Sequence, residues 1–106
     1  MSFYPERRIK PRIICDYPAI VVGCDREGIK YRERAKLANL SASGLFMKAN
    51  RIIDNGSALS VIILLTSERI HKNTPKIGTN GVVVRTEPKN DGTCGVAVKF
   101  NSYRFQ

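Results

Sequence analysis

The sequence predicts an all-β domain, most simply a six-stranded antiparallel β-barrel. Apolar and polar residues alternate along most of the chain, which is the period of a half-buried strand. Turn signals built from Gly, Asn, Asp and Ser separate these runs. No segment has the apolar spacing of a convincing helix. At 106 residues the chain has room for one domain with a modest core.

The N-terminal residues predict an extended basic arm followed by a strand. We expect residues 1–6 to be a flexible lead-in, and residues 7–12 carry four cationic side chains. Pro11 removes a backbone donor and disfavours a helix there. From 13 to 21 every odd position is apolar, which predicts the first strand, with an edge position or a bend at Pro18.

Residues 29–37 predict the second strand of a hairpin, which follows a turn at 25–28. Helical spacing would scatter its charges around an axis, whereas strand spacing places them on one face. The cationic face holds Lys30, Arg32, Arg34 and Lys36. Solvation explains such a stripe more simply than a binding surface does.

The second half of the chain predicts four more strands. They lie at 44–48, at 58–66, through 82–84 and at 95–100, with turns at 54–56 and 89–92 and possible bulges at Gly78 and Gly81. The run 58–66 is apolar on both faces. We therefore expect a second cover over it, from a helix, a terminal segment or another subunit.

Composition and charge limit the function classes. The formal net charge of +9 predicts an anionic partner, although a solvated basic surface is an alternative. Three cysteines without a CxxC pair predict buried or half-buried free thiols and no metal site. The chain shows neither a signal peptide nor an apolar run of membrane-spanning length, so we expect a cytoplasmic protein without membrane insertion.

Catalysis is poorly supported, and the sequence predicts no enzyme. The single histidine, His71, lies in a polar segment from 67 to 76 that predicts a loop. Ser41 has no candidate base beside it in the sequence. A phosphate-binding P-loop and a dinucleotide-binding glycine motif are both absent.

Two short motifs favour anion and base recognition. Arg8 and Arg12 form an RxxxR pair, and a guanidinium group matches both phosphate oxygens and the O6/N7 edge of guanine. Asn39, Ser41 and Gly44 form an NxSxxG motif in a stretch that reads as a turn. The motif offers the amide of Asn39, the hydroxyl of Ser41 and, at Gly44, a backbone that no side chain obstructs.

In this order, separated by one predicted hairpin and followed by the glycine-led run 95–100, the two motifs resemble the PilZ domain family. The resemblance extends from about Arg7 to Phe100, and we assign residues 7–106 to one such domain. It implies a six-stranded antiparallel barrel. It also implies a bacterial receptor for the second messenger cyclic di-GMP, with no cofactor.

The resemblance also implies roles for individual residues. Arg8 and Arg12 would hold guanine and phosphate, Asn39 and Ser41 would hydrogen-bond guanine, and Gly44 would shape the turn. The arginine arm is expected to be mobile when free and to order around the ligand. Arg7 adds a third guanidinium, which either favours a stacked dimer of cyclic di-GMP or points into solvent.

Residues 101–106 leave room for about one helical turn, whereas many family members continue into a C-terminal helix. We expect no output domain, and therefore a response through a partner protein or self-association. One alternative function is a PilZ-like interaction module that does not bind the ligand. A less favoured one is a barrel for single-stranded nucleic acid, since Tyr31 is the one aromatic residue near the basic stripe and lies on its opposite face.

Overall fold

The computed structural model describes residues 12–66, 70 and 72–106, and within these ranges it contains strands and turns but no helix. The all-β prediction is therefore confirmed. The strands are β1 (Ile13–Ile14), β2 (Pro18–Cys24), β3 (Lys30–Leu40), β4 (Gly44–Ala49), β5 (Ala58–Leu64), β6 (Lys76–Pro88) and β7 (Cys94–Phe105).

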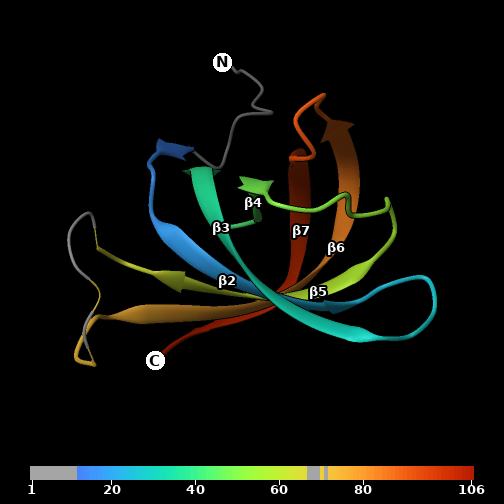
Figure 1. The fold of residues 1–106 in the computed structure, drawn as a ribbon. Helices are drawn as coiled ribbons and strands as arrows, with labels where there is room; N and C mark the ends of the chain where they lie inside the picture. The colour runs from blue at the N-terminus through green and yellow to red at the C-terminus, as the bar shows by residue number, and fades with distance from the viewer. Residues whose placement is uncertain (1–11, 67–69, 71) are drawn as a thin grey trace, which may run out of the picture.

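Six of these strands close into an antiparallel barrel (Figure 1). The strand order is β3-β2-β5-β6-β7-β4, and a pairing between β4 and β3 completes the ring. β3 closes the barrel because its residues 30–36 pair with β2 and its residues 35–40 pair with β4. The two-residue β1 pairs with the C-terminal end of β3, where Ile13 lies opposite Leu40.

Apolar side chains from all six barrel strands fill the interior. Leu37, Met47, Val61, Ile63 and Val96 are each no more than 2% exposed. A barrel of this size has an interior just wide enough for side chains to occupy, so it is a packed core and not a channel.

The predicted first strand is divided in two. Residues 13–14 pair with β3 as β1, but β2 begins only at Pro18. Proline has no N–H to donate and is tolerated at the first position of a strand. Ile13 and Ile14 are 60% and 89% exposed, so the alternating pattern wrongly placed Ile13 on a buried face.

β6 and β7 are longer than the sequence predicted. Residues 101–105 continue β7 and pair with β6 as far as Ile77, so this segment is a strand and not a turn of helix. The pairing contains a register shift between Asn80 and Gly81. The extra residue is Asn101 of β7, opposite Gly81, so this bulge lies on the strand that pairs with the glycines and not at Gly78 or Gly81 themselves.

The other sequence predictions have mixed outcomes. Gly28, Gly56 and Gly92 have positive φ angles of 81°, 90° and 86°, which confirms the three predicted turns. The second cover over 58–66 is partial, because Leu64 is buried while Ala58 is exposed.

Cys94 is buried and Cys15 half-buried, but Cys24 is exposed because it ends β2 at the turn. His71 lies outside the residues that the structure describes.

Candidate functional site

The NxSxxG motif lies across a strand end and a tight turn. Asn39 is within β3, and only residues 41–43 form the connection to β4. The Ser41 N–H donates to the Gly44 carbonyl at 2.9 Å, and the Ser43 N–H donates to Ser41 Oγ at 3.3 Å. The turn is thus closed by its own short polar residues, as expected for Ser-rich turns.

A β-bulge directs Asn39 towards the outside of the barrel. The pairing of β3 with β4 shifts register between Leu37 and Asn39, which leaves Ala38 as the extra residue. Leu37 is buried in the interior, and Asn39 lies opposite the half-buried Phe46 on the outer wall. Bulges re-aim side chains in this way, and they are common beside functional sites.

Gly44 has a different structural role from the one expected. It is the first residue of β4, and its φ is not among the positive angles. A Cβ at this position would collide with the backbone carbonyl oxygen of Val98 in β7. The motif's glycine therefore permits close approach of two strands rather than a special turn conformation.

A groove of about 380 Å³ follows this part of the outer wall. Its volume is within the range of small-molecule sites. Three cationic side chains line the groove, and none of its lining residues is acidic. The lining residues are Arg12, Asn39, Ser41, Ser43, Gly44, Leu45, Phe46, Val84, Arg85, Ala97, Val98 and Lys99.

The structure thus brings four of the six predicted site residues to one groove. Arg12, which immediately precedes β1, meets Asn39, Ser41 and Gly44 there. Arg7 and Arg8 lie outside the described residues.

The sequence motifs missed the part of the groove that β4, β6 and β7 supply. Phe46 comes from β4, Val84 and Arg85 come from β6, and Lys99 comes from β7. Local sequence patterns give no signal for these residues, because strand register decides which side chains share a face.

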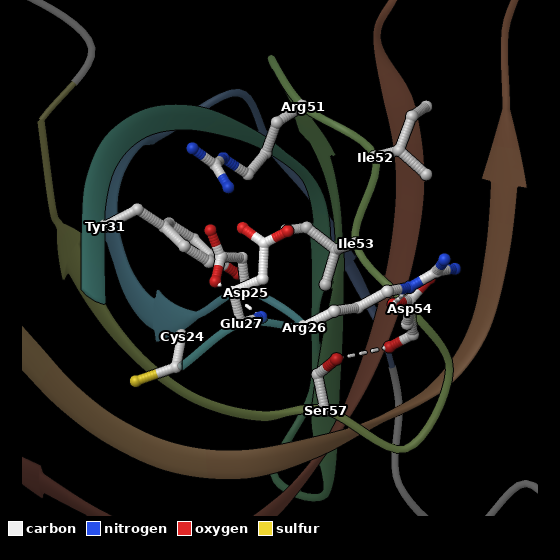
Figure 2. A pocket seen from close by; sticks show the side chains of 10 residues that line it. All are labelled: Cys24, Asp25, Arg26, Glu27, Tyr31, Arg51, Ile52, Ile53, Asp54 and Ser57. Atoms are coloured by element: carbon white, nitrogen blue, oxygen red, sulfur yellow. Dashed lines mark hydrogen bonds and ion pairs between the residues drawn. The ribbon is translucent and has the colours of Figure 1, made fainter. Parts of the chain in front are cut away.

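A second recess of about 430 Å³ lies between the 25–29 turn and the 50–57 loop (Figure 2). Arg26 joins these two segments through Nε and Nη2, at 2.8 Å and 3.0 Å from the two carboxylate oxygens of Asp54. That hydrogen bonding raises the pKa of Arg26 and lowers the pKa of Asp54. The charges of Arg26 and Asp54 are therefore already paired with each other.

Arg51 occupies the same recess, beside Tyr31 in Figure 2. Its guanidinium carbon lies 3.9 Å from the centre of the Tyr31 ring, and its Nε lies 2.8 Å from Glu33 Oε2. Burial raises the pKa of Tyr31. The recess is lined by Asp25, Glu27 and Asp54 against Arg26 and Arg51, so acids outnumber bases. An anionic ligand is better matched by the smaller groove, whose charged lining residues are all cationic.

Two absences apply to the described part of the chain. It contains no group of three or more His, Cys, Asp or Glu side chains that could hold a metal ion. Nor does it contain a helix with the length and hydropathy needed to cross a membrane.

Comparisons with known proteins agree with this fold. The PilZ domain family model matches residues 6–105. The Bacillus subtilis inhibitor of motility, MotI/DgrA, is 20% identical with a TM-score of 0.69, and the match covers 94% of this chain and 45% of that one. The chain thus spans less than half the length of that protein.

A second solved structure is the PilZ domain of YcgR from Escherichia coli with cyclic di-GMP. It is 12% identical with a TM-score of 0.59, and the match covers 92% of this chain and 79% of that one. No curated protein matches the chain.

Proposed function

Because the chain belongs to the PilZ domain family, we propose that it is a bacterial receptor for cyclic di-GMP, acting in the cytoplasm without catalysis. One observation carries the proposal: Arg12, Asn39, Ser41 and Gly44 line a single groove that contains cationic and no acidic side chains. The structural similarity to a PilZ domain with cyclic di-GMP supports the choice of ligand.

The groove chemistry suits a guanine dinucleotide. The Arg12 guanidinium can donate two parallel hydrogen bonds, either to a phosphate or to the O6/N7 edge of guanine. The Asn39 amide can both donate and accept along a base edge, and the Ser41 hydroxyl adds a further polar atom. Arg8 would complete the cationic side of the site, and its position lies outside the described residues.

Isothermal titration of the protein with cyclic di-GMP tests this function and counts the bound molecules. We expect saturable binding, a ligand-dependent rise in melting temperature, and loss of both in Arg12→Ala. Arg32→Ala is the matched control, because Arg32 is an exposed arginine of β3 that does not line the groove. If the wild-type protein shows no heat and no thermal shift, the receptor proposal fails.

The stoichiometry tests the role of Arg7. Two dinucleotides per protomer support a stacked ligand dimer whose four phosphates need an additional cation. One dinucleotide per protomer contradicts that role.

A protein-interaction module without ligand binding is the second candidate. The similarity to a protein described as an inhibitor of motility favours it, since an inhibitor acts on a target. The exposed Ile13 and Ile14 offer apolar contact area beside the groove. Titrations without heat, together with intact folding, would favour this reading.

A further inference from the structure

One row of side chains crosses the groove from Asn39 of the NxSxxG motif to three residues that belong to neither motif. Across neighbouring strands, Asn39 of β3 lies opposite Phe46 of β4, Phe46 opposite Ala97 of β7, and Ala97 opposite Arg85 of β6. Adjacent strands are about 4.8 Å apart, so the row extends over about 14 Å. A ligand held at the Asn39 end can therefore extend towards Arg85.

Arg85 is directed into this row by a second bulge. The pairing of β6 with β7 shifts register between Val83 and Arg85, which leaves Val84 as the extra residue. Val83 is buried, whereas Val84 is 51% exposed and the Arg85 side chain is 61% exposed. Bulges at Ala38 and Val84 thus lie on the strands at the two ends of the row.

The neighbours of Arg85 hold its guanidinium over the groove. The guanidinium carbon lies 5.5 Å from the centre of the Phe46 ring, within the range of a cation–π contact. Arg85 Nε lies 3.1 Å from Glu87 Oε2, and Lys89 Nζ lies 3.8 Å from Glu87 Oε1. Gly95 makes room here, since a Cβ on it would lie 2.7 Å from the end of the Phe46 ring.

The ion pair with Glu87 is replaceable. Both partners are more than two-fifths exposed, and exposed pairs contribute little free energy. A phosphodiester offers the same two-oxygen geometry as a carboxylate, and a guanidinium binds either one. A phosphate entering the groove can therefore take the place of Glu87 beside Arg85 without a large rearrangement.

We propose that Arg85 is a further ligand-binding residue, which exchanges its carboxylate partner Glu87 for a phosphate of the bound dinucleotide. The inference rests on the proposed cyclic di-GMP function and extends it to a wall outside the two motifs. Arg12 and Arg85 come from opposite sides of the groove, on the segment before β1 and on β6. Each would neutralise one of the two phosphates.

The test is isothermal titration with cyclic di-GMP of the wild-type, Arg85→Ala, Arg85→Lys and Glu87→Gln proteins. We expect Arg85→Ala to weaken affinity about tenfold or more, because it removes a charge-assisted hydrogen bond. Arg85→Lys keeps the charge but not the planar fork, so its affinity should be intermediate. Glu87→Gln should bind more tightly than wild type, because the competing charge is gone.

Arg32→Ala serves again as the control for a general loss of positive charge, and its affinity should match that of the wild type. Melting temperatures without ligand should agree among all variants, since every substituted side chain is at the surface. Wild-type binding with an unchanged affinity in Arg85→Ala overturns this inference and leaves the receptor function intact. Weaker binding by Glu87→Gln overturns the exchange. Absent wild-type binding overturns the receptor proposal itself.

Discussion

Gly44 of β4 lies opposite Lys99 of β7, at a point where the backbone of β7 approaches too closely for any side chain on Gly44. The obstructing atom is the carbonyl oxygen of Val98, which belongs to the backbone and cannot rotate away. The glycine of the NxSxxG motif therefore maintains the wall on which the groove is built. Its substitution should affect the fold as well as the ligand.

Gly44→Ala should lower the free energy of unfolding by about 1–3 kcal/mol, the usual cost of forcing an extra carbon into a packed site. Thermal melting without ligand measures the effect. Gly56→Asn is the control, because a Cβ at Gly56 meets no atom within 4 Å and asparagine tolerates positive φ. Equal melting temperatures for Gly44→Ala and wild type would contradict the close approach.

Asn39→Ala should weaken cyclic di-GMP binding about tenfold, because its amide faces the groove and would hydrogen-bond a base. The melting temperature of the free protein should change little, since Asn39 faces outward from the core. Asn50→Ala is the matched control: Asn50 is exposed and donates a long 3.4 Å bond to the Arg34 carbonyl. Equal affinities for the two variants would remove Asn39 from the site.

Met47→Ala should lower the free energy of unfolding by about 2–5 kcal/mol. Met47 is fully buried in the barrel interior, so its truncation leaves a cavity there. Chemical denaturation measures the change, and Lys48→Ala provides the control because Lys48 faces outward on the same strand. A small effect of Met47→Ala would show that the interior is loosely packed.

The pair formed by Arg26 and Asp54 should contribute to acid sensitivity. The pKa of Asp54 is lowered in the folded state, chiefly by its hydrogen bond to Arg26. The folded state therefore binds fewer protons than the unfolded state, and the contribution is present at neutral pH and lost as the pH falls through the lowered pKa.

Carboxyl NMR titration measures this pKa directly in the intact protein. The pKa of Asp54 should lie below its ordinary value of about 3.9 in the wild type and return towards that value in Arg26→Ala. Denaturation midpoints recorded from about pH 5 to about pH 1 should fall less steeply for Asp54→Asn than for wild type. An unchanged Asp54 titration in Arg26→Ala would show that the ion pair does not form in solution.

The period-2 pattern predicted the barrel well where strands are regular. All four residues of the cationic face, Lys30, Arg32, Arg34 and Lys36, are exposed, as expected from the alternation. Leu37 is buried on the opposite face. The turn glycines were predictable because few other residues adopt positive φ.

The groove was only half predictable, because two irregularities determine its shape. Ala38 and Val84 are bulge residues, and neither residue type marks a bulge in a sequence. Each bulge changes which neighbour faces outward. Arg85 joins Phe46 and Asn39 through pairing between strands that are distant in sequence, and local patterns do not contain that register.

The packed interior of the barrel determines whether a bound molecule is accessible to a partner protein. Leu37, Met47 and Ile63 are buried inside the ring of strands, whereas the groove follows the outer wall, so a ligand in the groove lies outside the barrel. Part of the ligand would then remain in contact with solvent, next to the protein's own side chains. A partner protein that docks over the groove would contact the nucleotide directly. The bound nucleotide would then form part of the protein–protein interface.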